Sequence, residues 1–188
     1  DSATMINKVY EVIEAKNIFN IPYNKIEILI HPKSYIHSLI KFNNGLIKII
    51  AHDTTMKIPI FNTIYNNSDK KLKSKVINFK ILNNLNLNKV DLIRYPMIKL
   101  MKHLSNRSSL FETIIVSAND KLVDLFLKNK IKFTDIQKEL FKIINLKEFQ
   151  KFKKKSPNKI NEIKKLNHYV HLKILKKVYK TKDVSKYY

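Results

Sequence analysis

Four polar residues near the beginning of the chain could bind a phosphorylated ligand. They are Ser2, Asn7, Lys8 and Glu11, within the stretch DSATMINKVYE. If this stretch is helical, Asn7 and Lys8 lie four and three positions before Glu11, so their polar ends share one side of the helix. The amino-terminal end of a helix favours an anion, and hydroxyl, amide and ammonium groups are donors that a phosphate accepts. The arrangement would suit a phosphate group.

Glu11 would add a metal-binding group to the same helix. Its carboxylate offers the hard oxygen that Mg²⁺ or Mn²⁺ prefers. The cluster would then suit a phosphorylated substrate that is bridged to a divalent cation. One carboxylate is an incomplete metal site, and the alternative is a capped surface helix whose Lys8–Glu11 ion pair contributes roughly a few tenths of a kcal/mol.

The histidines carry a weaker signal. His31 and His37 flank a Pro-Lys-Ser-Tyr-Ile stretch, and strand alternation places His37 on a face with Tyr35. A lone histidine beside apolar strand residues is more often structural than catalytic, so both interpretations stay open. His52 and His103 have no companions in the sequence that indicate a site.

The residue pattern of the first third predicts a helix and then antiparallel strands. Apolar residues at helical spacing predict a helix that is capped by Ser2 or Thr4 and runs to about Asn20. Residues 25–30 alternate as a half-buried strand, which ends at Pro32 because proline removes a backbone donor.

An Asn-Asn-Gly stretch predicts a β-hairpin in the same region. It lies between the apolar runs 35–42 and 46–51. An Asn-Gly pair between two strand-like runs is typical of a tight primed turn, in which both central residues have positive φ. The predicted strands are therefore antiparallel neighbours.

The remainder of the chain predicts a linker and helices. Residues 66–92 are polar and rich in Asn and Lys, which indicates a linker. Four amphipathic segments with short connections follow, and they predict a bundle; they cover about 98–104, 118–127, 136–144 and 159–180. The predicted fold class is α+β, with a helix and an antiparallel hairpin followed by a linker and a carboxy-terminal four-helix bundle. We expect three parts, namely 1–65, 66–92 and 93–188.

The composition excludes several kinds of site. With no cysteine among its 188 residues, the chain has no disulfide, thiolate zinc site or cysteine nucleophile, and any metal must bind oxygen or imidazole. No apolar run is long enough to cross a bilayer. The net charge of +22 would normally indicate nucleic acid. However, abundant Lys, Asn, Ile, Tyr and Phe are typical of an AT-rich genome, in which Lys marks solvated surface.

Several stretches, taken together and in order, resemble the 1-deoxy-D-xylulose 5-phosphate reductoisomerase family. DSATMINK with the following Glu11 is highly specific, and the other stretches are individually weaker. The resemblance covers most of the chain and fades in the Lys-rich tail. The other matching stretches are LIHPKSYIHS (29–38), MKIPI (56–60), RYPMIKL (94–100), Ala118-Asn119 and IKFTDI (131–136).

This resemblance implies roles for individual residues. Ser2, Asn7 and Lys8 would bind the phosphate of the substrate. Glu11 would be one of three acidic ligands to a divalent metal, and His37 lies in a catalytic-domain motif that is sometimes tied to activity. The other two acidic ligands and the NADPH-binding domain would lie upstream. The resemblance therefore implies a carboxy-terminal half with no cofactor-binding residue of its own for NADPH.

The reaction implied is the NADPH-dependent conversion of 1-deoxy-D-xylulose 5-phosphate to 2-C-methyl-D-erythritol 4-phosphate, in non-mevalonate isoprenoid biosynthesis. Mg²⁺, Mn²⁺ or Co²⁺ would polarise the substrate carbonyl. We expect a homodimer to which the 35–51 hairpin contributes, no membrane partner, and a cytoplasm of a bacterium or endosymbiont, with a plastid-type organelle as the alternative. Because one carboxylate holds a metal ion poorly, this chain alone is predicted to be inactive.

The chain departs from the family pattern at several positions. They are Thr54-Thr55 in place of Pro-Asp, Asn66-Asn67 in place of Trp-Pro, and Val116 and Asp120 in the stretch where the family has Asn-Ala-Ala-Asn-Glu. None of them removes a residue that the resemblance assigns to phosphate or metal.

Two alternatives from other classes stay open. One is a basic RNA-binding protein, suggested by KKLKSK (70–75) and KFKKKSPNK (151–159), although a recognition motif and interleaved aromatic residues are missing. The other is a degenerate, non-catalytic homologue. The presence of Ser2, Asn7, Lys8 and Glu11 argues against decay.

Overall fold

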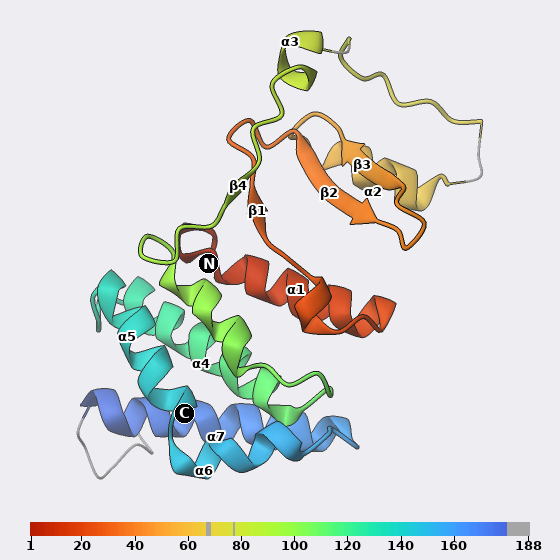
Figure 1. Ribbon diagram of the computed structural model, residues 1–188. Coiled ribbons are helices and arrows are strands. Elements are labelled where there is room, and N and C mark those ends of the chain that lie inside the picture. Colours follow the sequence, from red (N-terminus) through yellow and green to blue (C-terminus); the bar gives the residue numbers. More distant parts are fainter. Residues whose placement is uncertain (67–68, 77, 180–188) are drawn as a thin grey trace. The chain divides into compact units, whose positions relative to one another are not determined.

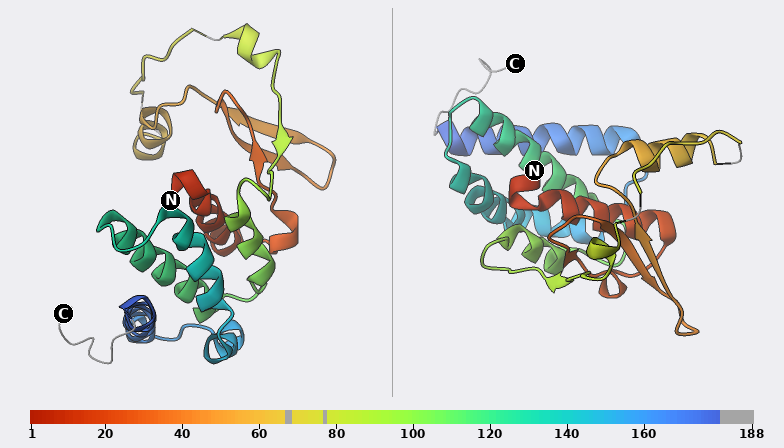
Figure 2. Two further views of the ribbon diagram at one scale, coloured as in Figure 1. Left: turned by 90° about the vertical axis from the view of Figure 1, so that its left-hand side faces the viewer. Right: turned by 90° about the horizontal axis from the view of Figure 1, so that it is seen from above.

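The computed structural model describes residues 1–66, 69–76 and 78–179, and Figures 1 and 2 show it as ribbons. The chain forms two compact units. The first contains Asp1–Glu27 and the chain from Asp91 onward, and the second contains Ile28–Val90. None of the helices in the described ranges has the length and hydropathy to cross a membrane.

The first unit is helical, with α4 in contact with most of its carboxy-terminal elements. Helix α4 packs against α5 and α7 and also touches α6 and η4, whereas α1 packs against η3. The elements in chain order are the 3-10 helix η1 (Ser2–Thr4), α1 (Ile6–Phe19), the 3-10 helices η2 (Tyr23–Lys25) and η3 (Pro96–His103), α4 (Leu110–Leu127), α5 (Phe133–Ile144), α6 (Lys147–Gln150), the 3-10 helix η4 (Lys151–Lys154) and α7 (Ile160–Tyr179).

The core of this unit surrounds α4, which is apolar on most of its circumference. A helix with apolar residues on nearly all sides needs neighbours on nearly all sides. Its neighbours supply apolar faces at helical spacing, as in α5, where Ile136, Leu140, Ile143 and Ile144 are buried. The fully buried side chains include Ile6, Val9, Leu100, Ile114, Ile115, Ala118, Leu122, Leu140, Phe149 and Val170.

The α+β fold class predicted from the sequence is confirmed, with corrections to individual elements. The segment predicted as the first helix of the bundle is the 3-10 helix η3. Helix α4 begins at Leu110, earlier than predicted, because the Glu112 carboxylate accepts a hydrogen bond from the Ser109 N–H at the helix start (3.2 Å). Helix α7 agrees with the prediction for 159–180, of which Lys180 lies outside the described residues.

The second unit contains two separate antiparallel strand pairs (Figure 1). Strand β1 pairs with β4 in the register Leu29↔Lys89 and Ile30↔Asn88. Strands β2 and β3 form the predicted hairpin, with Ile40 opposite Lys48. The elements are β1 (Leu29–Ile30), β2 (Ile36–Lys41), β3 (Ile47–Ala51), the helices α2 (Lys57–Ile64) and α3 (Phe79–Leu82), and β4 (Asn88–Lys89).

The turn of the hairpin differs from the predicted primed turn. Gly45 has a φ of 87°, but Asn43 and Asn44 do not have positive φ. The Gly45 N–H donates to the Phe42 carbonyl (3.0 Å) and the Phe42 N–H donates to the Leu46 carbonyl (2.9 Å). The turn is therefore a three-residue loop whose last position needs glycine, which is the next most common hairpin connection.

The predicted strand and linker are also shorter than expected. Of residues 25–30, only Leu29–Ile30 is a strand, because Tyr23–Lys25 forms η2. The segment 66–92, of which 67, 68 and 77 lie outside the described residues, contains α3 and β4. The expected division into 1–65, 66–92 and 93–188 stays a prediction.

A buried polar network attaches the end of α1 and η2 to the start of α4. The Tyr23 hydroxyl donates a hydrogen bond to Glu112 Oε1 (2.7 Å). Burial raises the pKa of Tyr23, and the bond to Glu112 raises it further. The buried Lys16 ammonium donates to Ser108 Oγ (2.8 Å) and to Asn17 Oδ1 (3.2 Å). These bonds satisfy charged groups that would be unfavourable if they were buried without partners.

We predict that Tyr23→Phe lowers the free energy of unfolding by about 2 kcal/mol, because the buried Glu112 carboxylate loses a donor. Tyr10→Phe is the matched control, since the buried Tyr10 hydroxyl has no hydrogen-bond partner among the described residues. Its removal is expected to leave stability unchanged or to raise it by up to about 1 kcal/mol. Urea unfolding of both variants measures the difference. Equal losses in the two variants would contradict the assigned role of Tyr23.

Candidate functional site

A short turn precedes α1 and replaces the cap that the sequence predicts. The Thr4 N–H and hydroxyl both donate to the Asp1 carbonyl (3.2 and 2.9 Å), and the Met5 N–H donates to the Ser2 carbonyl (3.1 Å). Neither Ser2 nor Thr4 caps the helix through its side chain, and Met5 occupies the cap position with a φ of 58°. The prediction of a Ser2 or Thr4 cap was therefore wrong, because the backbone turns before the helix begins.

The positive φ of Met5 is unusual for a residue with a side chain. Left-handed conformations of non-glycine residues are unfavourable by about 1 kcal/mol or more and persist where the surrounding structure enforces them. They are concentrated at binding and catalytic sites. Here the conformation separates Ser2 from the first turn of α1, which carries Asn7 and Lys8.

Lys8 and Glu11 form the contact that their spacing predicts. The Lys8 ammonium lies 2.8 Å from both Glu11 carboxylate oxygens. The side chains are 43% and 54% exposed, respectively. Such a solvated pair contributes little to stability. Both groups are therefore accessible to ligands at low cost.

Ser2 and Asn7 lie beside this pair without joining it. Ser2 is exposed and Asn7 is half-buried. Within the described ranges, neither side chain has a hydrogen bond to Lys8 or Glu11. The structure thus places all four predicted residues at one end of α1 and brings only two of them into contact.

A divalent cation at Glu11 would need further ligands. No group of three His, Asp or Glu side chains with a suitable arrangement exists in the described part of the chain. Glu11 itself fits the role, because its carboxylate is exposed and carries the oxygen donors that Mg²⁺ and Mn²⁺ prefer. The remaining ligands would have to come from another segment or another chain.

A part-buried polar contact, which sequence reasoning missed, joins the turn before α1 to α4. Asn119 of α4 is fully buried, and its Nδ2 donates to Asp1 Oδ1 (2.9 Å). Burial raises the pKa of the nearby Tyr10 hydroxyl, and the negative charge of Asp120 raises it further. Burial also raises the pKa of Asp120, and His171 opposes that effect. The sequence drew attention to Asn119 through the Ala118-Asn119 stretch of the resemblance, but it gave no indication of the contact with Asp1.

His37 pairs with a histidine that the sequence left unassigned. Its ring stacks on the ring of His52 with a centroid distance of 3.6 Å. His37 Nε2 lies 3.2 Å from the His52 carbonyl oxygen and His52 Nδ1 lies 2.6 Å from the Asp53 carbonyl oxygen, so both nitrogens must donate. This pairing accounts for the positions of both rings without a catalytic role, and the assignment of His37 to activity stays a prediction.

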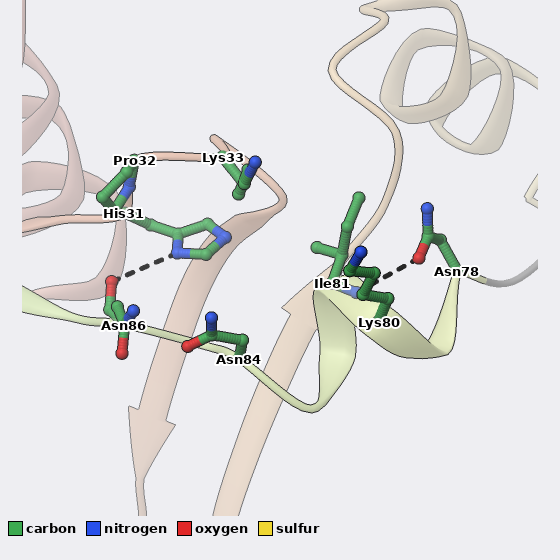
Figure 3. A pocket seen from close by; sticks show the side chains of 8 residues that line it. All are labelled: His31, Pro32, Lys33, Asn78, Lys80, Ile81, Asn84 and Asn86. Carbon is green, nitrogen blue, oxygen red and sulfur yellow. Dashed lines mark hydrogen bonds between the residues drawn. The ribbon is translucent and has the colours of Figure 1, made fainter.

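The second unit contains a cavity of about 390 Å³, shown in Figure 3. Amide and ammonium groups of α3 and the adjoining loops line it, together with His31, which is 8% exposed. His31 Nδ1 lies 3.3 Å from the Asn86 carbonyl oxygen. Its Nε2 has no solvent-accessible surface and no partner among the described residues. Both interpretations of His31 therefore stay open, since the residue lines the cavity while its Nε2 is buried.

The amino-acid sequence of this chain is similar to those of curated enzymes that share one name. It is 67% identical over 174 residues to 1-deoxy-D-xylulose 5-phosphate reductoisomerase of Pelagibacter ubique, covering 93% of this chain and 45% of that relative. It is 35% identical over 151 residues to the enzyme of the same name from a Sulfurihydrogenibium species, covering 80% and 40%. The chain thus spans somewhat less than half the length of these curated relatives.

Solved structures agree with these relatives. The 1-deoxy-D-xylulose 5-phosphate reductoisomerase of Zymomonas mobilis in complex with NADPH has a TM-score of 0.79 at 28% identity, covering 95% of this chain and 46% of that one. A DOX-P reductoisomerase in complex with NADPH, fosmidomycin and magnesium has a TM-score of 0.82 at 26% identity, covering 95% and 45%. The family model described as "DXP reductoisomerase C-terminal domain" matches residues 53–171, which is more than half of the chain. The chain therefore belongs to the DXP reductoisomerase family.

Proposed function

We propose that this chain is the carboxy-terminal part of an NADPH-dependent reductoisomerase that converts 1-deoxy-D-xylulose 5-phosphate to 2-C-methyl-D-erythritol 4-phosphate. The observation that carries the proposal is the identity of 67% over 174 residues to a curated enzyme of that name. The cluster at the start of α1 supports it, because its groups match a phosphorylated, metal-bound substrate. The binding of NADPH would belong to an upstream part of the enzyme.

Ser2, Asn7 and Lys8 would bind the phosphate group of the substrate. A hydroxyl, an amide and an ammonium provide neutral and charged donors, and the amino-terminal end of a helix favours an anion. Contacts to a phosphate remote from the reacting carbons provide binding energy that holds a short sugar in register. This proposal gives Ser2, Asn7 and Lys8 a common use.

Glu11 would be one ligand of a divalent cation, Mg²⁺ or Mn²⁺ with Co²⁺ as a further possibility. When bound, the cation supplies Lewis-acid polarisation of the substrate carbonyl, and NADPH supplies the hydride. The ion pair between Lys8 and Glu11 couples the two binding functions (2.8 Å). A phosphate that attracts the Lys8 ammonium would free the Glu11 carboxylate for the metal. Because the ion pair is exposed, separating its two charges needs little free energy.

We also propose a homodimer to which the hairpin β2–β3 contributes. Its side chains are exposed along most of both strands, including Leu39, Ile40, Ile47, Ile49 and Ile50. Exposed apolar residues in this density indicate a surface that another chain or segment covers. The bacterial relatives favour a bacterial cytoplasm as the compartment, with a plastid-type organelle as the alternative.

RNA binding is the weaker alternative. It rests on the net charge of +22 and on basic runs that lie on exposed surface. Association with RNA that falls steeply with salt concentration would favour it. Indifference to RNA at moderate salt would exclude it.

The test of the proposed function uses a complete enzyme, which joins the upstream part of the Pelagibacter ubique relative to this chain and is called the joined enzyme below. We predict that Glu11→Gln lowers its Mg²⁺-dependent oxidation of NADPH by about 100-fold or more, since several kcal/mol of transition-state stabilisation depend on the metal. Glu14→Gln is the matched control, because it makes the same change on an exposed residue of α1 and should retain activity.

The same substitution should have little effect on stability. Because the pair is exposed, Glu11→Gln is expected to change the free energy of unfolding by less than about 0.5 kcal/mol. An inactive but stable variant would support a binding role. Unchanged metal-dependent turnover would contradict the assignment of Glu11, and an inactive unsubstituted joined enzyme would support the degenerate, non-catalytic alternative.

We further predict that the 188-residue chain alone does not turn over the substrate, because Glu11 is a single carboxylate without further acidic ligands in the described ranges. The measurement is NADPH absorbance with substrate and Mg²⁺, using the joined enzyme as the positive control. Oxidation of NADPH by the chain alone would show that its own residues complete the site.

A further inference from the structure

The turn that carries Ser2 is attached to α4 through one buried amide. Asn119 Nδ2 donates to Asp1 Oδ1 at 2.9 Å, across 118 positions of sequence. Asn119 has no exposed surface. Asp1 itself is exposed, so the contact is part-buried. A hydrogen bond to a carboxylate is stronger than one between neutral groups, and the buried amide would be unfavourable without it. This contact therefore has more effect on the position of Asp1 than an exposed contact would have.

Asp1 holds the turn through two different groups. Its carbonyl accepts both bonds from Thr4, while its carboxylate accepts the bond from Asn119. The turn also contains the left-handed Met5 (φ 58°), which needs constraint from its surroundings. Anchoring of Asp1 to α4 provides such a constraint. Ser2 follows Asp1 directly, so its position depends on the same contact.

Asn119 also lies near the first turns of α1. Its amide is close enough to Tyr10 to lower the pKa of that hydroxyl, against the larger effects of burial and Asp120 that raise it. No hydrogen bond of good geometry joins the two, since the Tyr10 hydroxyl and Asn119 Oδ1 both lack partners among the described residues. Asn119 is thus close to both Asp1 and Tyr10. The segment of sequence between Asp1 and Tyr10 contains the residues assigned to phosphate binding.

We propose that Asn119 is a positioning residue, which sets the place of Ser2 relative to Asn7 and Lys8 by holding the Asp1 carboxylate. The inference rests on the proposed function, because it assumes that these three residues bind phosphate. Asn119 is fully buried and cannot touch the substrate itself. Its effect is specific to the phosphate end of the site, because Glu11 is fixed by the helix and not by the turn.

The test measures steady-state kinetics of Asn119→Ala in the joined enzyme. The KM for 1-deoxy-D-xylulose 5-phosphate should rise about tenfold, in line with the loss of a hydrogen bond to a charged group. The KM for NADPH and the Mg²⁺ concentration for half-maximal rate should not change. Asn167→Ala is the matched control, because Asn167 Nδ2 donates to Ser117 Oγ of α4 at 2.8 Å and this contact does not reach the turn.

A second set of variants separates positioning from folding. Asn119→Asp preserves the size of the side chain but places two carboxylates together, so the KM for the phosphorylated substrate should rise again. Adding Asp1→Asn restores one amide and one carboxylate with exchanged positions, and should recover most of the lost affinity. Such recovery requires a direct interaction between the two side chains.

Three outcomes would overturn the inference. The first is an unchanged KM for the phosphorylated substrate in Asn119→Ala. The second is a change in the KM for NADPH that Asn119→Ala and Asn167→Ala share. The third is no recovery of substrate affinity in the double variant Asn119→Asp with Asp1→Asn. Thermal unfolding of all variants identifies effects that come from folding alone. If the unsubstituted joined enzyme is inactive, the proposed function fails instead, so the two failures are distinguishable.

Discussion

The packing of α1 within the first unit depends on two polar contacts that both end on α4, of which one is buried and the other part-buried. Glu112 near its start accepts from Tyr23, and Asn119 donates to Asp1. These contacts hold the two ends of the segment 1–23, while Ile6 and Val9 bury apolar surface between them. Apolar burial is not directional, so it favours contact without fixing a register. The two hydrogen bonds determine how α1 is aligned along α4. This alignment in turn determines where the polar residues of α1 lie.

The candidate site has a buried side that is held by contacts to α4 and an exposed side whose polar groups are held only weakly. Its buried side is fixed by Asn119 and by the core of α4, whereas Lys8 and Glu11 meet in solvent. Groups that bind ligands need to exchange partners, and an exposed ion pair allows this exchange at little cost in stability. A buried pair would be far harder to separate, because each charge would then lack a partner. This division explains how the segment can be well ordered and still available to a ligand.

Periodic patterns predicted α1, α5 and α7, because burial on one face leaves a regular apolar spacing. The Asn-Asn-Gly stretch predicted the hairpin, whose strand β3 is exposed along its length. The Lys8–Glu11 contact was also predictable, since helical geometry determines which neighbours meet. Strand β4 was missed because Asn88–Lys89 is a two-residue polar segment without apolar alternation. The left-handed conformation of Met5 was missed because a methionine does not indicate a positive φ. The contact between Asn119 and Asp1 was missed because partners 118 positions apart leave no local pattern in the sequence.

The departures of α4 from the family pattern follow this physical division only in part. Within Val116-Ser117-Ala118-Asn119-Asp120, the fully buried Ala118 and Asn119 match the family, while Val116 is half-buried and Asp120 is exposed. The third departure, Ser117, is buried, and its hydroxyl accepts a hydrogen bond from Asn167 (2.8 Å). A half-buried or exposed position tolerates a change of side chain, since solvent can replace a lost partner. The fully buried Asn119 position is less tolerant, because an apolar substitute there removes the donor to Asp1. Composition can therefore shift toward Lys and Asn over the surface of this chain while the contact between Asn119 and the turn before α1 is kept.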